Sequence, residues 1–94
     1  MSVHEVDSDV LDRIADSDSP QGLLAVAEVH DAELSSISKC RRVVVIDSVQ
    51  DPGNVGAIVR TAAAAGFEAI VASPGTADLL SPRSIRASAG TIFT

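Results

Sequence analysis

The sequence is nearly devoid of aromatic residues: it has two phenylalanines, no tryptophan and no tyrosine among 94 residues. Binding of single-stranded nucleic acid by stacking bases on aromatic rings therefore has almost nothing to act on. Cys40 is the only cysteine, which leaves no intrachain disulfide and no metal cluster built on thiolates. We expect its side chain to be a small apolar group, buried or half-buried.

Long apolar runs and a basic leader are also missing. No run approaches the ~18 apolar residues of a membrane helix, and the first residues, MSVHEVDSD, are acidic, unlike a signal peptide. We therefore expect a cytoplasmic protein without membrane contact. His4 and His30 are isolated in polar sequence, so we expect both in solvent and expect no metal site.

The charged residues are unevenly distributed around a net charge of −6. Residues 1–39 carry nine acids and two bases, whereas residues 40–94 carry four acids and five bases, all of them arginine. The first part would repel a phosphate backbone and the second would not, and arginine suits bidentate contact with phosphate. The polar segment 30–39, with at most a helical turn, marks a domain boundary near residue 39.

The first part of the chain predicts a short helix over residues 8–16, a turn over residues 17–22 and a buried strand over residues 23–29. Ser8 or Asp9 would cap the helix. Its apolar side chains fall on one face: Val10, Leu11 and Ile14.

The second part predicts alternating strands and helices, and hence an α/β fold. RRVVVID and FEAIVAS are typical of buried parallel strands, the first of them central and covered on both faces. Between them a helix runs from Asn54 or Val55 to Ala65 and ends at Gly66. Ser81 and Pro82 open a further helix, and the final TIFT predicts the start of a third strand.

The loop DSVQDPGN, residues 47–54, follows the first of these strands. Open α/β sheets bind ligands at the carboxyl ends of their strands. The loop is not a nucleotide-binding motif, because G-x-x-G replaces G-x-G-x-x-G and the lysine of a P-loop is missing. Gly53 and Gly56 could simply allow a tight turn and close packing, and Asn54 could be only an N-cap. Arg60 follows Asn54 by about 240° around the helix, so the two need not share a face.

A longer stretch of the sequence resembles the first signature motif of the SpoU (TrmH-type) RNA 2′-O-methyltransferases of the SPOUT superfamily. This stretch reads VVVIDSVQDPGNVGAIVRTAAAAGFEAIVAS. A second block, ADLLSPRSIRASAGTIF, is similar to the segment that follows in that family, and SPQGLLAV is similar to a phrase that precedes the catalytic domain. The residues that match the two motif cores are Asp47, Val49, Gln50, Asp51, Pro52, Gly53, Asn54, Gly56, Arg60, Ala62, Ser81, Pro82, Arg83, Arg86, Ser88 and Gly90.

The resemblance implies that residues 40–94 are the first half of a SPOUT (α/β knot) methyltransferase domain with a partial parallel sheet. Residues 1–39 would be the remnant of a small RNA substrate-binding domain plus a linker. Arg60 would be the catalytic arginine near the ribose 2′-hydroxyl, and Asn54 would help to orient the site. Plausible RNA contacts are Arg83, Arg86 and Ser88.

Members of this family bind S-adenosylmethionine in a C-terminal knot and form homodimers with the site near the subunit interface. The later motifs that build the knot do not occur in these 94 residues. We therefore expect a truncated fragment of an rRNA or tRNA methyltransferase that is inactive and binds no cofactor alone. A non-catalytic RNA-binding or interaction module derived from the family is the alternative, and an unrelated nucleotide-binding α/β domain is a third hypothesis.

Overall fold

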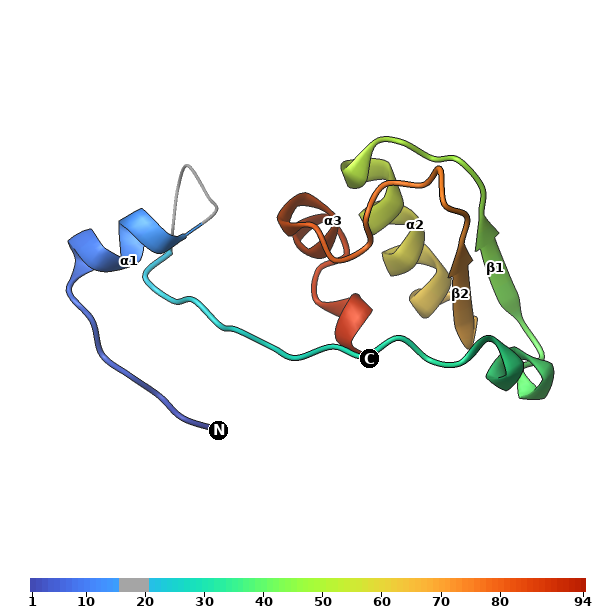
Figure 1. Cartoon of the computed structure of the whole chain (residues 1–94), viewed down its shortest axis with the longest axis horizontal. Helices are drawn as coiled ribbons and strands as arrows, with labels where there is room; N and C mark the ends of the chain where they lie inside the picture. Colours follow the sequence, from blue (N-terminus) through green and yellow to red (C-terminus); the bar gives the residue numbers. More distant parts are fainter. Residues whose placement is uncertain (16–20) are drawn as a thin grey trace.

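The computed structural model describes residues 1–15 and 21–94 (Figure 1). Helix α1 (Ser8–Ile14) and a 3₁₀ helix, η1 (Leu34–Lys39), precede a small α/β unit. In chain order that unit contains β1 (Val43–Ile46), α2 (Pro52–Ala64), β2 (Ala69–Ala72), α3 (Pro82–Ala87) and the 3₁₀ helix η2 (Thr91–Phe93). The predicted α/β class is confirmed.

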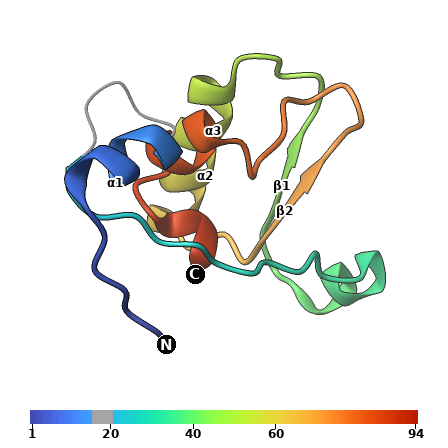
Figure 2. The ribbon, with the colours of Figure 1, turned by 60° about the vertical axis from the view of Figure 1, so that its left-hand side comes forward.

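The sheet consists of β1 and β2, which run parallel with Val43 opposite Ala69 and Ile46 opposite Ala72. The pairing confirms both predicted strands. Helix α2 connects them and lies against one face (Figures 1 and 2). The expectation that β1 is covered on both faces is wrong, because Val45, which points away from α2, is 67% exposed.

Helix α2 supplies most of the core. Its buried apolar residues, Val55, Val59 and Ala62, lie with Ile46 of β1. The helix begins at Pro52, two or three residues before the predicted start, because the Asp51 side chain accepts a hydrogen bond from the Asn54 N–H (2.9 Å) and so caps it. The predicted C-terminal glycine, Gly66, has φ of +80°, the left-handed conformation that ends many helices.

Helix α3 packs against α2 at Gly56. A Cβ built on Gly56 would overlap the Ser84 carbonyl oxygen and lie 2.6 Å from Ala87 Cβ and 2.9 Å from the Ser88 nitrogen. Only glycine allows the two helices to lie this close. The predicted start of α3 is confirmed, since Pro82 occupies its first turn and Ser81 Oγ accepts from the Ser84 N–H at 3.3 Å.

Two predicted strands are wrong. Residues 23–29 form no strand, and Leu23 and Val26 are 86% and 96% exposed. A strand needs the N–H and C=O groups of a neighbour, and in the described structure residues 23–29 have no strand beside them, since the sheet there consists of β1 and β2. Residues 91–93 form η2, because Gly90 has φ of +80° and the Thr91 N–H donates to the Ser88 carbonyl (3.1 Å).

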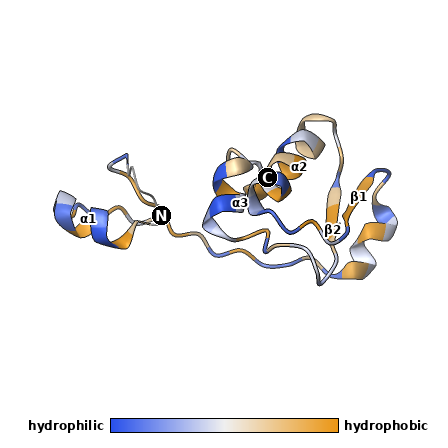
Figure 3. Cartoon of the chain, turned by 90° about the horizontal axis from the view of Figure 1, so that it is seen from above, coloured by the Kyte–Doolittle hydropathy of each residue, from blue (hydrophilic) through white to orange (hydrophobic). Residues whose placement is uncertain are grey.

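Helix α1 stands apart from the α/β unit in Figure 1, whereas residues 29–37 line a broad groove together with β2 and part of α2. Helix α1 is confirmed from Ser8 to Ile14, and none of its residues is buried. The expected cap at Ser8 or Asp9 is wrong, because Asp7 occupies the N-cap position and both predicted residues lie within the helix. Figure 3 shows both hydrophobic and hydrophilic residues on this helix. The predicted turn at residues 17–22 lies mostly outside the described residues. Cys40 is half-buried and both histidines are exposed, as expected.

Candidate functional site

Two loops meet at the carboxyl ends of the parallel strands: residues 47–51 after β1 and residues 73–81 after β2. The Ser48 N–H donates to Ser73 Oγ (2.9 Å), and the Ala77 N–H donates to the Val49 carbonyl (2.8 Å). The two loops therefore form one structural unit. This unit stands at the end of the sheet where α/β proteins bind ligands.

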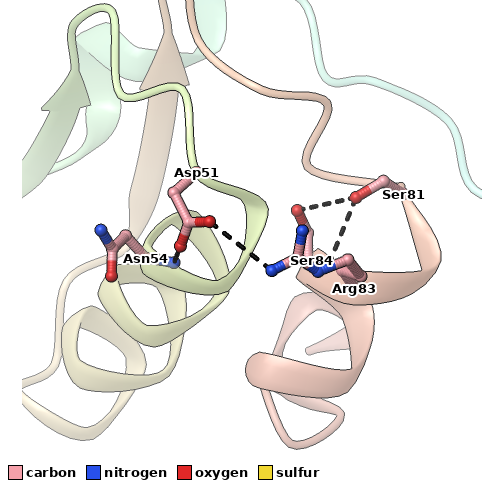
Figure 4. Close-up of polar contacts among 5 residues, drawn as sticks. All are labelled: Asp51, Asn54, Ser81, Arg83 and Ser84. Carbon is pink, nitrogen blue, oxygen red and sulfur yellow. Dashed lines mark hydrogen bonds and ion pairs between the residues drawn. The ribbon is translucent and has the colours of Figure 1, made fainter.

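Asp51 links the starts of helices α2 and α3 (Figure 4). One carboxylate oxygen, Oδ2, accepts the Asn54 N–H, and the other, Oδ1, lies 3.6 Å from Arg83 Nη2. Both side chains of this ion pair are largely exposed, so it contributes little to stability. The contact places the Arg83 guanidinium beside the N-terminus of α2.

A serine network fixes the other side of this junction (Figure 4). Ser81 Oγ donates to Ser84 Oγ (3.0 Å), and the buried Ser84 hydroxyl donates to the Asp78 carbonyl (2.8 Å). Ser88, a predicted RNA contact, is also buried, and its hydroxyl donates to the Ile85 carbonyl (2.7 Å). Arg83 and Arg86, the other predicted RNA contacts, are exposed on α3.

The structure does not bring the side chains of Asn54 and Arg60 together on one face of α2. Asn54 points away from Arg83 (Figure 4) and lines an open hollow of about 590 Å³ between α2 and β1. The rest of this hollow is mostly apolar and includes Val44, Val49, Ile58 and Phe67.

Arg60 does not line that hollow. Its side chain is exposed, and among residues 1–15 and 21–94 it has no ion pair and no side-chain hydrogen bond. An arginine without a protein partner keeps all its donors for an external anion. Within the same described ranges no cluster of three or more histidine, cysteine or acidic side chains is arranged to hold a metal ion. Nor does any helix there have the length and apolar character needed to cross a membrane.

Comparison with known families decides which family this arrangement belongs to. The model of the SpoU rRNA Methylase family matches residues 41–94, which is the whole α/β unit with both loops. The chain belongs to the SpoU rRNA methylase family.

Related proteins agree with this assignment. A 23S rRNA guanosine 2′-O-methyltransferase of Bacillus subtilis is 38% identical over 85 residues, which are 90% of this chain and 33% of the relative. An uncharacterized tRNA/rRNA methyltransferase of Synechocystis is 38% identical over 91 residues, 95% of this chain and 33% of the relative. A 23S rRNA guanosine 2′-O-methyltransferase of Bordetella pertussis is 40% identical over 76 residues, 74% of this chain and 31% of the relative. The chain thus spans about a third of the length of these relatives.

The SpoU match contains every site residue predicted from the sequence, but two features of the site escaped prediction. The first is the capping role of Asp51, which its position directly before Pro52 could have revealed, since Asp before a proline is a helix-start pattern. The second is the contact of Ser48 with Ser73 and, through it, Thr76. No local pattern indicates this contact, because its partners lie 25 residues or more apart in the chain.

Proposed function

We propose that this chain forms the RNA-facing part of an S-adenosylmethionine-dependent RNA ribose 2′-O-methyltransferase that acts on rRNA or tRNA. The observation that carries the proposal is Arg60, an exposed guanidinium without a partner among the described residues. It stands on the helix that follows the ligand-binding end of a SpoU-type sheet. Residues 40–94 would belong to the catalytic domain, and residues 1–39 to the end of an RNA-binding domain and its linker.

The proposed role of Arg60 follows from the chemistry of the substrate. A ribose 2′-hydroxyl is a poor nucleophile at neutral pH, so the reaction needs a group that stabilises negative charge developing on the oxygen or fixes the adjacent phosphate. A guanidinium provides both possibilities, because it is always charged and can donate two parallel hydrogen bonds. The absence of a described protein partner for Arg60 supports this role.

Asn54 is the proposed orienting residue. Its backbone N–H is used by Asp51, while its side-chain amide has no hydrogen bond with the described residues and can contact a substrate. Asn54 and Arg60 lie about 9 Å apart along the helix axis and on different sides of it. A substrate that contacts both must therefore extend across α2, as an RNA strand can.

Arg83 and Arg86 are the proposed contacts to the RNA backbone, since both are exposed on α3. Arg83 stands beside Asp51, so a phosphate would compete with this carboxylate for the guanidinium. For Ser88, the burial of its hydroxyl and the bond to the Ile85 carbonyl favour a role in holding the end of α3.

Neither of two hollows in the described residues offers S-adenosylmethionine a cationic side chain. S-adenosylmethionine carries a carboxylate. Neither the hollow beside Asn54 nor the broad groove that β2 forms with residues 29–37 is lined by a lysine or arginine. We therefore assign no cofactor contact to this chain and derive no step through the cofactor. We further propose that the protein is cytoplasmic. We also propose a homodimer, for which the exposed apolar side chains of Val45 and Phe67 are available contact surface.

The experiment that tests the proposal replaces Arg60 in the full-length protein and measures transfer of labelled methyl groups to rRNA and tRNA. We expect Arg60→Ala to lower methyl transfer by about 100-fold or more, the size of effect seen when one charge-stabilising donor is removed. Arg41→Ala is the matched control: it removes another exposed arginine, which lies just before β1, and should leave the rate unchanged. Full activity of Arg60→Ala would refute the catalytic role.

The alternative of a non-catalytic RNA-binding module makes a different prediction. In that case Arg60→Ala and Arg83→Ala would weaken RNA binding, and each would reduce its salt dependence, by ~0.7–0.9 in the logarithmic slope per lost phosphate contact. No labelled methyl group would reach the RNA even with the unmodified full-length protein and S-adenosylmethionine. Methyl transfer by that protein rules this alternative out.

A further inference from the structure

Four polar groups at the carboxyl end of the sheet form a continuous chain of hydrogen bonds. The Ser48 N–H lies 2.9 Å from Ser73 Oγ, which lies 3.2 Å from Thr76 Oγ1, which lies 3.0 Å from the Ile46 carbonyl oxygen. The two hydroxyls are partly buried. We call these groups of Ile46, Ser48, Ser73 and Thr76 the hydroxyl clasp.

The direction of each bond follows from the number of hydrogens available. A hydroxyl has one hydrogen to donate, and Thr76 donates its hydrogen to the Ile46 carbonyl, which can only accept. Ser73 must therefore donate to Thr76, and its oxygen accepts from the Ser48 N–H. All bonds run in one direction, an arrangement in which each hydrogen bond strengthens the next.

The clasp holds a residue whose backbone is strained. Ser48 has φ of +56°, a left-handed conformation that costs a non-glycine residue free energy and persists only where its surroundings enforce it. Gly75 lies against it: a Cβ on Gly75 would stand 3.0 Å from Ser48 Oγ. Ser48 is also where the chain leaves β1 and enters the loop that leads to Asp51 and Asn54.

We propose that the Thr76 hydroxyl is a positioning group for the substrate-side loop, residues 47–51, and through it for Asn54. This inference rests on the proposed function, since it assigns a purpose to the loop that precedes Asn54. The Ile46 carbonyl also accepts the Ser73 N–H at 2.9 Å. Loss of the Thr76 hydroxyl therefore leaves this buried strand end paired, and it removes the group that orients the Ser73 hydroxyl, the acceptor of the Ser48 N–H.

Amide hydrogen exchange of the 94-residue chain tests the clasp directly. Thr76→Val keeps the branched shape and removes the hydroxyl, whereas Thr76→Ser keeps the hydroxyl. We expect Thr76→Val to lower the protection of the Ser48 amide, because its acceptor Ser73 Oγ is no longer held by Thr76. The Ser48 bond itself remains, so the loss should be at least about twofold and at most about tenfold, the worth of a whole hydrogen bond. Thr76→Ser should restore it. The Glu68 amide, which donates to the Arg42 carbonyl at the other end of the sheet, serves as reference and should not change.

Binding of a fluorescein-labelled, mixed-sequence RNA to the same variants, followed by anisotropy, tests the consequence for function. We expect Thr76→Val to bind about threefold or more weakly, with Thr76→Ser equal to the unmodified chain. An unchanged Ser48 amide in Thr76→Val, an equal loss at Glu68, or no recovery in Thr76→Ser overturns the positioning role. RNA affinity that stays unchanged in Thr76→Val, although the Ser48 amide has lost protection, also overturns the positioning role. Failure of the unmodified chain to bind RNA instead counts against the proposed function, and the exchange data then still decide whether the clasp holds the loop.

Discussion

Replacement of Gly56 by alanine provides a test of the α2–α3 junction in which two physical effects have opposite signs. In an isolated helix this change is favourable by ~1 kcal/mol, because alanine has the higher helix propensity. In this protein the new methyl group would meet the Ser84 carbonyl oxygen, the Ala87 methyl group and the Ser88 nitrogen, the last two at 2.6 and 2.9 Å. Two of these three atoms are backbone, which cannot rotate away.

The contact should outweigh the propensity. Overpacking of a well-packed interface costs ~1–3 kcal/mol, and the upper part of this range, ~2–3 kcal/mol, applies where backbone must move. After the helix gain of ~1 kcal/mol is subtracted, we expect a net loss of about 1–2 kcal/mol of unfolding free energy. For a domain of this size such a loss lowers the melting temperature by about 4–16 °C. Separation of the two helices would also expose the buried Ser84, whose hydroxyl donates to the Asp78 carbonyl.

Far-UV circular dichroism is the suitable assay, since the chain has no tryptophan or tyrosine to report by fluorescence. Gly53→Ala is the matched control on the same helix. A Cβ there would lie 3.1 Å from Asp51 Oδ2, the end of a side chain that can shift slightly, so we expect a change within about 1 kcal/mol. A Gly56→Ala protein as stable as the unmodified chain would show that α2 and α3 do not pack as closely as described.

The two helix caps give further predictions. Asp51→Ala should lower the unfolding free energy by ~1 kcal/mol, because the Asn54 N–H loses its acceptor, while Asp51→Asn should retain most of the stability as a good cap. Urea denaturation measures both, and equal losses in the two variants would assign the effect to the Arg83 ion pair instead of the cap. Ser81→Ala should likewise cost ~1 kcal/mol or more, because the Ser84 N–H loses its acceptor. Ser81→Asp should recover the cap but not the donation to Ser84 Oγ, and so fall between the two; a stable Ser81→Ala would mean that this cap contributes nothing.

The sequence predicted the elements whose signals are local. The β-branched run before Asp47 indicated β1, and the spacing of Val55, Val59 and Ala62 indicated α2. Ser81 followed by Pro82 indicated the start of α3. These signals suffice because side-chain shape, helix periodicity and capping depend on residues a few positions apart.

The errors occurred where an element depends on a distant partner. Residues 23–29 are as apolar as a strand but have no strand beside them in the described structure. Residues 91–93 became η2 because Gly90 redirects the chain after α3. The exposed face of β1 at Val45 could not be foreseen either, since composition does not tell which faces of a strand are covered.

The sequence by itself determined the SpoU family and the identity of the proposed site residues, because a motif is a property of residue order. It also determined that Asn54 and Arg60 differ in direction around their helix, since this follows from helix geometry alone. Only the tertiary structure decided that Ser88 is buried, that Arg83 stands beside Asp51, and that Thr76 reaches Ser48 through Ser73. These contacts join residues up to 32 positions apart, and they form only when the two parallel strands bring their following loops to the same end of the sheet.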